Sequence, residues 1–510
     1  MKDGLTRQER WKAWLYAVLI VAAMLALGAL ALWLTLGGCR EEKTSLPPES
    51  DALLTAAESL DEISVDAVFD PEAGTLAARQ TMSLVNRSGQ TLQEITLRSW
   101  SGAYLLEDTS PAATDELFDP CYGESFSPGG LTLSNAQVNR VAVTWAWTDA
   151  ASTVLTLPVK DWLPGESVAV TLDYTVAIPV CRSRFGVSDG VWQLGNVFPT
   201  AAVWLGGELR TDEYVSIGYP FLSECANWTV RLTVPAGYTA AATGSPGGTD
   251  VQDGQTACTY TASAVRDFAL VISDKWQIVS LMADDVLVTA CARDKTAARQ
   301  MAECARQAIA CYEAHYGPYA YPTLTLCEVS FPWDGVSYPR LSMIGTSQTG
   351  SRDALEEAVA RETARQWWGM MAGSDGWYQP WQSEALCEYA VLDYVGQTQG
   401  DAARESRIFE RIETAMRITI LEGITPGSPI DYFASTSEYN VVTRQRGAAL
   451  LLALENYLGK DGLDSFLAAY QGTYRFRIAI RQDMEELASG MAGQDLSVLF
   501  LDYLDTEISN

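Results

Sequence analysis

Histidine is almost absent from this chain of 510 residues, which contains His315 alone. A zinc site of two histidines and a glutamate needs two imidazoles, so no such site can be built from this sequence. Basic residues are also scarce: 35 Lys and Arg stand against 64 Asp and Glu, for a formal net charge of −29. So acidic a chain is not expected to bind nucleic acid, and it suits a soluble surface outside the cytoplasm.

The ten cysteines lack the paired spacing of metal or redox motifs, and no C-x-x-C motif occurs. Cys304 and Cys311 lie two turns apart on a predicted helix, which is too far for a disulfide. We therefore expect most cysteines to be free thiols. The sequence leaves open one or two disulfides in the part of the chain that is predicted to lie outside the cell.

A long hydrophobic run near the start of the chain predicts a membrane anchor. Residues 13–36 are almost wholly apolar and uncharged, about the length needed to span a bilayer. An excess of Lys and Arg in residues 1–12 predicts a cytoplasmic N-terminus, a single pass, and an extracytoplasmic remainder. Leu36-Gly37-Gly38-Cys39 resembles a bacterial lipobox, so a lipoprotein lipidated at Cys39 is the alternative. Both interpretations tether the protein to the cell membrane, with residues 37–60 as a linker.

Two domains are predicted after the linker, in an α+β, multidomain arrangement. Residues 61–277 predict an antiparallel β domain, because short alternating apolar and polar stretches are separated by Gly, Pro, Asn and Asp. Its predicted strands include Ile63–Phe69, Ala78–Asn86, Glu94–Ser99, Val141–Ala146, Thr153–Leu157 and Ser167–Val176. Residues 278–510 predict a mixed α/β domain that ends in helices. Its predicted elements are a strand at 286–290 and helices at 295–315, 402–421, 448–458, 462–470 and 483–488, with a loop at 423–429.

The second domain is organised around Arg361-Glu362-Thr363-Ala364-Arg365-Gln366-Trp367-Trp368-Gly369. Residues 353–368 predict a helix, with Asp353 as the N-cap and Glu356 and Glu357 in the first turn. Positions 361 and 365 are four apart, so their side chains leave one face of this helix. In zinc peptidases of the H-E-x-x-H type these two positions hold the histidine ligands, and the glutamate between them activates the metal-bound water.

This stretch resembles the active-site helix of the membrane alanyl aminopeptidase family, which are zinc metallopeptidases of the gluzincin, thermolysin-like kind. The family pattern is H-E-x-x-H-Q-W-W-G followed by W-x-N-E, and here Trp381-Gln382-Ser383-Glu384 follows. Residues 366 to 383 separate Arg365 from Glu384, the interval that the family keeps between its second histidine and its glutamate ligand. Arginine stays protonated and offers no lone pair. The resemblance therefore implies a degenerate member that retains Glu362 and Glu384 but lacks the zinc ligands at Arg361 and Arg365.

Two further motifs imply altered roles in the substrate cleft. Residues 335–341 resemble the family strand G-G-M-E-Y-P-G, whose glutamate grips the free amine of the substrate; that position here is Ser337. Residues 439–448 resemble Y-x-x-V-x-Y-x-K-G-A, which begins at Tyr439 and whose second tyrosine stabilises the oxyanion; that position here is Arg444. Motifs at 195–199, 219–224, 228–238 and 317–322 also follow the family order, so the resemblance covers roughly residues 60–510.

The substitutions preserve charge, since two arginines carry the same charge as two neutral histidines and a zinc dication. We therefore expect Arg361 and Arg365 to lie at the former metal position and to pair with Glu362 and Glu384. Losing the amine-binding glutamate and gaining Arg444 would make the cleft favour acidic peptides or C-termini. The alternatives are that both arginines are solvated, or that Arg–Glu pairs plug the cleft and it binds nothing.

The sequence thus predicts a membrane-tethered, extracellular, aminopeptidase-like pseudoenzyme without a metal cofactor. Its role would be peptide or protein binding, scaffolding or regulation. The alternative is an active metallo-aminopeptidase with an unorthodox metal site, for example at Glu384, Cys387 and Glu388. A third interpretation is a structural component of the cell envelope. His315 has no partner ligand in sequence, so we expect it to be structural or exposed.

Overall fold

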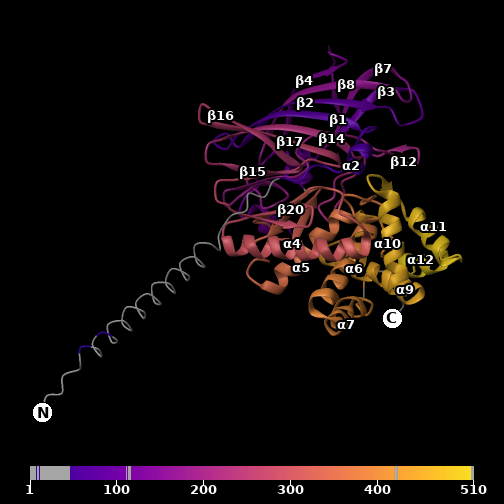
Figure 1. Ribbon diagram of the computed structural model, residues 1–510. Coiled ribbons are helices and arrows are strands. Elements are labelled where there is room, and N and C mark those ends of the chain that lie inside the picture. The colour runs from indigo at the N-terminus through magenta and orange to yellow at the C-terminus, as the bar shows by residue number, and fades with distance from the viewer. Residues whose placement is uncertain are drawn as a thin grey trace. The chain divides into compact units, whose positions relative to one another are not determined.

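The structure is a computed structural model (Figure 1) that describes residues 7, 11, 46–110, 112, 116–418, 420 and 423–506. The chain divides into two units, Met1–Ser45 and Leu46–Asn510. The predicted membrane anchor at 13–36 and the lipobox cysteine, Cys39, lie outside the described residues. None of the helices in the described part of the chain has the length and apolar character needed to cross a bilayer.

The β-rich part is built on an eight-stranded sheet in the order β16-β17-β14-β1-β2-β8-β4-β5. Its strands are β1 (Asp61–Asp70), β2 (Thr75–Val85), β4 (Gly130–Val138), β5 (Val141–Ala142), β8 (Ser167–Ala177), β14 (Ala226–Pro235), β16 (Ser245–Gln252) and β17 (Gln255–Val265). Burial alternates along β1, as the two-residue period of a strand requires when one face covers a core. β1 pairs antiparallel with β2 but parallel with β14, so the domain is not purely antiparallel as predicted.

Two four-stranded sheets complete this part. The strands of the first follow the order β11 (Thr200–Ala201), β3 (Leu92–Arg98), β7 (Val154–Trp162) and β6 (Ala146–Trp147). Those of the second follow the order β15 (Thr239–Ala242), β18 (Leu270–Ser273), β10 (Val191–Leu194) and β9 (Phe185–Ser188). A separate hairpin consists of β12 (Trp204–Leu205) and β13 (Glu208–Leu209). The single strand predicted at 141–146 is wrong. β5 and β6 belong to different sheets, because the chain crosses between them here.

The segment predicted as a linker contains a docked helix, α2 (Asp51–Ala57). Ser50 caps it by accepting a hydrogen bond from the Leu53 amide, and Leu53 is buried against the sheet. Just before the helix, Glu49 pairs with the fully buried Arg340 at 3.1 Å. A capped helix with a buried leucine and an ion pair to the second domain fixes this segment to the fold.

The C-terminal half opens with a five-stranded sheet in the order β19-β20-β21-β23-β22. Its strands are β19 (Gln277–Ala283), β20 (Val286–Ala292), β21 (Thr323–Val329), β22 (Gly335–Tyr338) and β23 (Leu341–Gly345). The strands β20, β21 and β23 run parallel, and β22 forms an antiparallel edge. Helix α4 (Lys295–Tyr316) packs on this sheet. Its bounds agree with those of the helix predicted at 295–315 to within one residue.

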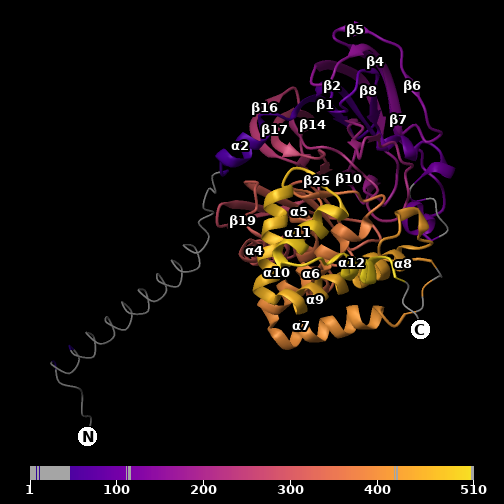
Figure 2. The same cartoon turned by 90° about the vertical axis from the view of Figure 1, so that its right-hand side faces the viewer.

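The remaining helices form the end of the chain and lie on the opposite side of the molecule from β5 and β6 (Figure 2). They are α5 (Arg352–Trp367), α6 (Pro380–Gln399), α7 (Asp401–Arg407), α8 (Thr436–Tyr439), α9 (Gly447–Leu458), α10 (Lys460–Tyr474), α11 (Arg481–Ala492) and α12 (Ser497–Leu504); α3 (Phe118–Tyr122) belongs to the β-rich part, and β24 (Gly373–Ser374) pairs with β25 (Ile478–Ala479). α12 lies within residues 448–510, which the sequence predicts to end in helices. The fold is a multidomain α+β arrangement with a β-rich N-terminal part and a helical C-terminal part.

Two stretches of π-helix interrupt the helical part. The helix predicted at 402–421 continues beyond α7 as a π-helical stretch, Ile408–Glu413, and ends at Ala415 among the described residues. A second π-helical stretch, Asn440–Arg446, joins α8 to α9. Because a π-helical turn holds an extra residue, it shifts the direction of the side chains that follow, and such turns are frequent at functional sites.

The described cysteines are all free thiols, and eight of the nine are buried. No disulfide forms among the described residues, so neither of the disulfides that the sequence left open is found there. Cys304 and Cys311 are unbonded, as their spacing predicted.

Candidate functional site

The motif helix α5 begins one residue earlier than predicted, and its N-cap lies two residues earlier. Ser351 is the N-cap residue, and Leu355 donates its amide to the Ser351 carbonyl at 3.0 Å. Asp353 therefore lies in the first turn, where its charge favours the helix dipole, and is not the cap. Glu356 and Glu357 lie one turn further along. Every residue from 358 to 367 is buried, which excludes the solvated alternative for the two arginines.

Arg365 forms a two-pronged ion pair with Glu384 of α6. Its Nη1 lies 3.0 Å from Oε1 and its Nη2 donates to Oε2 at 3.1 Å. Arg444, from the second π-helical stretch, donates through Nε to the same carboxylate at 3.2 Å, and the Tyr439 hydroxyl donates to it at 3.5 Å. Burial disfavours the charge of Glu384, but Arg365 and Arg444 outweigh it and lower its pKa to about 2. The predicted pairing of Arg365 with Glu384 is confirmed.

Arg361 pairs with a different set of carboxylates. Its Nη2 lies 3.1 Å from Glu357 and 3.2 Å from Glu388, and its Nη1 lies 3.6 Å from Asp334. Arg411, from the first π-helical stretch, adds a contact of 2.8 Å to Glu388. Burial opposes the charge of Glu388, yet Arg361 and Arg411 lower its pKa to about 2.

The two arginines therefore do not converge on one point, and this half of the prediction is wrong. Among the described residues, no ion pair joins Arg361 to Glu362 or Glu384. The reason is the antiparallel packing of α5 and α6. Arg365 lies opposite Glu384, so Arg361, one turn earlier, lies opposite Glu388, one turn later. The result is a ladder of two ion pairs between the helices.

Glu362, at the general-base position of the motif, is held by strand β22. Its Oε2 accepts a hydrogen bond of 2.8 Å from Ser337 and lies 3.5 Å from Nε of Arg365. Ser337 is fully buried and also lies 2.9 Å from the Ser342 hydroxyl. A Cβ on Gly335 would lie 2.6 Å from Cγ of Glu362, so the strand backs closely on this side chain. Ser337 therefore positions Glu362 and does not line the cleft.

A cavity of about 190 Å³ lies in front of the ladder, between the β-rich part and the helices. Its walls include six of the seven predicted site residues: Arg361, Glu362, Arg365, Glu384, Tyr439 and Arg444. The β-rich part supplies Arg184, Gly218 and Tyr219, which the sequence analysis missed. Arg184 belongs to no spacing motif, so only the packing of the two domains could reveal it.

The residues at the metal-ligand positions of the motif do not fit zinc. Two of the three positions hold guanidinium groups, which cannot ligate, and both oxygens of Glu384 lie in ion-pair contact with Arg365. The alternative ligand set of Glu384, Cys387 and Glu388 does not fit a metal either. Glu388 is bound by Arg361 and Arg411, and burial raises the pKa of the Cys387 thiol to about 12, so the thiol stays protonated.

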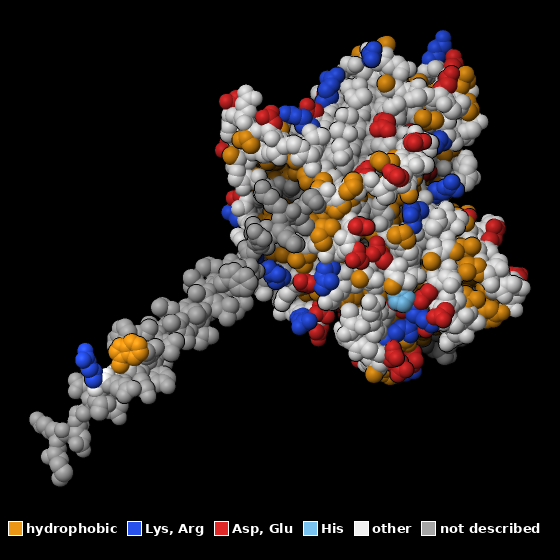
Figure 3. Space-filling model, viewed as in Figure 1, with side chains coloured by type: hydrophobic (Ala, Val, Ile, Leu, Met, Phe, Trp, Pro, Cys, Tyr) orange, Lys and Arg blue, Asp and Glu red, His pale blue; other side chains and the backbone are white. Residues whose placement is uncertain are grey.

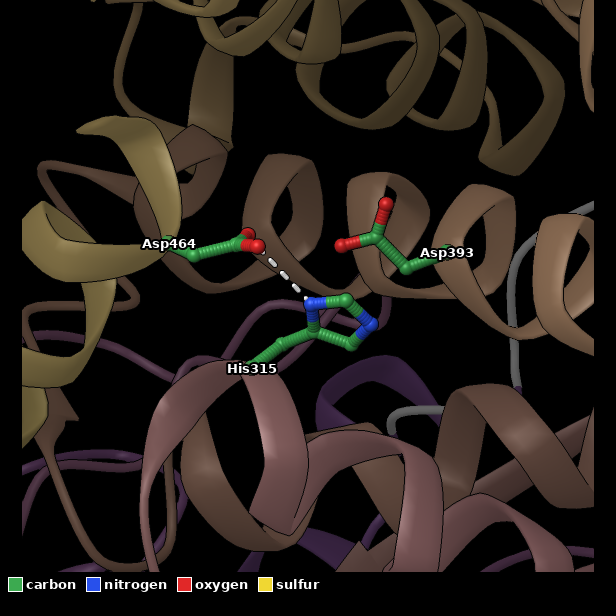
Figure 4. Close-up of side chains that lie close together, drawn as sticks. All are labelled: His315, Asp393 and Asp464. Atoms are coloured by element: carbon green, nitrogen blue, oxygen red, sulfur yellow. Dashed lines mark hydrogen bonds and ion pairs between the residues drawn. The ribbon is translucent and has the colours of Figure 1, made fainter. Parts of the chain in front are cut away.

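A different group of potential ligands lies around His315 at the end of α4. His315, Asp393 and Asp464 place ligand atoms within 4.8 Å of one another (Figure 4), and Nδ1 of His315 lies 2.9 Å from Asp464. The ammonium of Lys460 pairs with Asp464 and lies 3.1 Å from Asp393, so a cation of the protein already balances these carboxylates. Ion pairs of this kind are common here, where acidic and basic side chains intersperse over the helical part (Figure 3). His315 is a structural residue in this network.

Comparison with known proteins places this geometry in context. Residues 338–503 match the peptidase family M1 domain. The mouse protein Aminopeptidase RNPEPL1 is 27% identical over 204 residues, covering 37% of this chain and 28% of that protein. Mouse Aminopeptidase N is 21% identical over 207 residues, covering 37% of this chain and 21% of that protein. The matched segment thus spans less than a third of the length of either relative.

A solved structure shares the fold over a longer stretch. An M1 zinc metallopeptidase from Deinococcus radiodurans superposes with a TM-score of 0.61 at 17% identity, covering 88% of this chain and 95% of that one.

Proposed function

We propose that the chain, which matches the peptidase family M1 domain over residues 338–503, is a member of this family of zinc metallopeptidases and a pseudoenzyme without zinc peptidase activity. The observation that carries the proposal is the two-pronged pair of Arg365 with Glu384. A histidine position and the glutamate-ligand position of the family motif bind each other, so neither is free for a metal.

The chemistry of the remaining residues supports the same conclusion. Glu362 faces no polarised water that it could deprotonate, because the ligands that would hold the metal are arginines. Its carboxylate accepts from Ser337 and faces Arg365, contacts that hold it in place. Arg444 stands where the family has its oxyanion tyrosine, and its Nε is engaged by Glu384.

The role that replaces catalysis is binding. We infer a membrane-tethered, extracytoplasmic protein that binds a peptide or protein in the cleft, for scaffolding or regulation. The apolar run at 13–36 supports the single-pass anchor, with a lipid at Cys39 as the alternative. The extra arginines of the cleft support an acidic peptide or a C-terminus as the ligand. The net charge of −29 argues against nucleic acid.

The zinc content of the purified full-length chain tests the loss of catalysis. After zinc loading and removal of free metal in detergent, elemental analysis should give a ratio of zinc to protein near zero. A matched control is the double variant Arg361→His with Arg365→His, which gives the H-E-x-x-H pattern with eighteen residues between its second histidine and Glu384. This variant should bind about one zinc per chain.

One zinc per wild-type chain would contradict the proposal. It would favour the alternative, an active metallo-aminopeptidase with an unorthodox site, and an assay of aminopeptidase activity on the zinc-loaded protein would then decide between the two.

A further inference from the structure

Arg184 is a buried cation without a counter-charge in the wall of the cleft. It immediately precedes β9, only 9% of its surface is exposed, and it lines the cavity. Its Nη2 donates to the Gly218 carbonyl at 2.9 Å. Its Nη1 is buried and has no hydrogen-bond partner in the described part of the chain. No carboxylate of the described residues forms an ion pair with it.

The other charges of the cavity are largely balanced. Its three carboxylates are each paired with an arginine of α5: Asp334 with Arg361, and Glu362 and Glu384 with Arg365. Two cations of the cavity lie outside these pairs of α5. One is Arg184, and the other is Arg444, which contacts Glu384 through Nε alone within the described residues.

A buried guanidinium without a charged partner is unusual because of its desolvation free energy. Moving a charge out of water without a partner is expensive, so buried arginines are normally paired. Here the guanidinium lies over two aromatic rings, 4.9 Å from the centre of Phe221 and 5.8 Å from that of Tyr219. These rings and the Gly218 carbonyl fix the plane of the group and keep Nη1 free. A fixed guanidinium whose Nη1 has no partner in the described part of the chain can donate a charge-assisted hydrogen bond to a carboxylate.

We propose that Arg184 is the anion-recognition residue of the cleft and binds a carboxylate of a peptide ligand, with Arg444 as the second cation. This assignment rests on the proposed function as a peptide-binding pseudoenzyme. The cavity of about 190 Å³ is smaller than the pockets of roughly 300–1,000 Å³ that enclose whole small-molecule ligands. It therefore accepts one acidic side chain or one C-terminus, and the rest of the peptide lies outside it.

Calorimetric titration of the full-length chain with three tripeptides tests the proposal and separates the two sources of carboxylate. The first is acetyl-Ala-Glu-Ala-amide, whose only charge is the side chain. The second is acetyl-Ala-Gln-Ala with a free C-terminus, and the third is the neutral acetyl-Ala-Gln-Ala-amide. At least one charged peptide should bind at least tenfold more tightly than the neutral one, and the tighter of the two identifies the source.

The variant Arg184→Gln should weaken binding of that peptide by about 10- to 100-fold, the effect of losing a charge-assisted hydrogen bond. A matched control is Arg98→Gln. Arg98 is also buried, stacks on Trp100 at 3.9 Å and donates to a backbone carbonyl, but it does not line the cavity. This control should bind like the wild type. If Arg184→Gln does not fold, Arg184→Lys keeps the charge but loses the fork, and it should weaken binding by a smaller factor.

The outcomes are distinguishable. Binding of a charged peptide that is unchanged in both Arg184 variants would overturn the role of Arg184 and leave the peptide-binding function standing. No binding of any of the three peptides, or preference for the neutral one, would refute both the anion site and the peptide-binding role. Neither result bears on the loss of zinc catalysis, which the metal content decides separately.

Discussion

Removing Glu384 is the most direct perturbation of the ion-pair ladder. The substitution Glu384→Ala leaves Arg365 and Arg444 without the carboxylate that both contact. Arg365 is only 6% exposed, so water cannot replace the lost partner fully. We therefore expect a clear loss of stability, since a buried charge that loses its partner is costly.

Two independent arguments give a similar magnitude. Breaking a buried pair by removing one partner typically costs about 3–5 kcal/mol. The arginines lower the pKa of Glu384 from 4.5 to about 2, and at 1.36 kcal/mol per pH unit this is about 3 kcal/mol. Unfolding the roughly 460 residues of Leu46–Asn510 has an entropy of about 1 kcal/mol/K, at about 2.1 cal/mol/K per residue. The melting temperature should therefore fall by about 3–5 °C.

Differential scanning calorimetry at pH 7 measures this shift. Glu413→Ala is the matched control, because Glu413 forms a surface pair with Arg417 in which both side chains are more than half exposed. That control should lose less than about 1 °C. A second comparison replaces the pair as a whole: adding Arg365→Met to Glu384→Ala removes the stranded charge and should recover part of the loss. A melting temperature of Glu384→Ala equal to that of the wild type would refute the ladder as a stabilising element.

Two further predictions concern pH and packing. The folded-state pKa values of Glu384 and Glu388 are about 2, against 4.5 for an unperturbed glutamate, so their contribution to stability is full above pH 4.5 and is lost as the pH falls toward 2. Urea titrations in this range measure the free energy of unfolding, whose slope against pH should be smaller by about 1.4 kcal/mol per unit in Glu384→Gln than in the wild type. Equal slopes would contradict the assignment. Gly335→Ala should lower the free energy of unfolding by about 1–3 kcal/mol, because its Cβ would meet Glu362 at 2.6 Å. The Cβ of Gly472→Ala meets no atom within 4 Å, so this control should stabilise α10 slightly. Equal effects of the two variants would show that β22 shifts to make room for the added Cβ.

The parts of the fold that follow local pattern could be predicted from the sequence. The amphipathic period of residues 295–315 gave helix α4 within one residue of its observed end. The interval between Arg365 and Glu384 predicted their contact, because a spacing shared with the motif of the zinc peptidases implies a shared backbone arrangement. The strand at 141–146 failed because alternation alone does not show where a chain passes from one sheet to another.

The parts of the site that depend on tertiary register could not be predicted. The pairing of Arg361 with Glu388 follows from the antiparallel packing of α5 against α6, which no spacing within one helix specifies. Arg411 reaches the same carboxylate from a π-helical stretch, a feature without a signature in this sequence. Arg184 enters the cleft from the other domain, so its role depends entirely on how the two domains pack.

On the proposed absence of zinc, the ladder gives a reason why the spacing of the motif can persist without a metal. A zinc site needs two side chains one turn apart on α5 and a carboxylate on α6 at a fixed distance. Two ion pairs between antiparallel helices need the same turn on α5 and a second carboxylate one turn further along α6, which Glu388 supplies. The positive charges of Arg361 and Arg365 are thus balanced in two separate pairs with carboxylates of α6. Because ion pairs alone can hold this spacing of the two helices, the spacing by itself is no sign of catalysis.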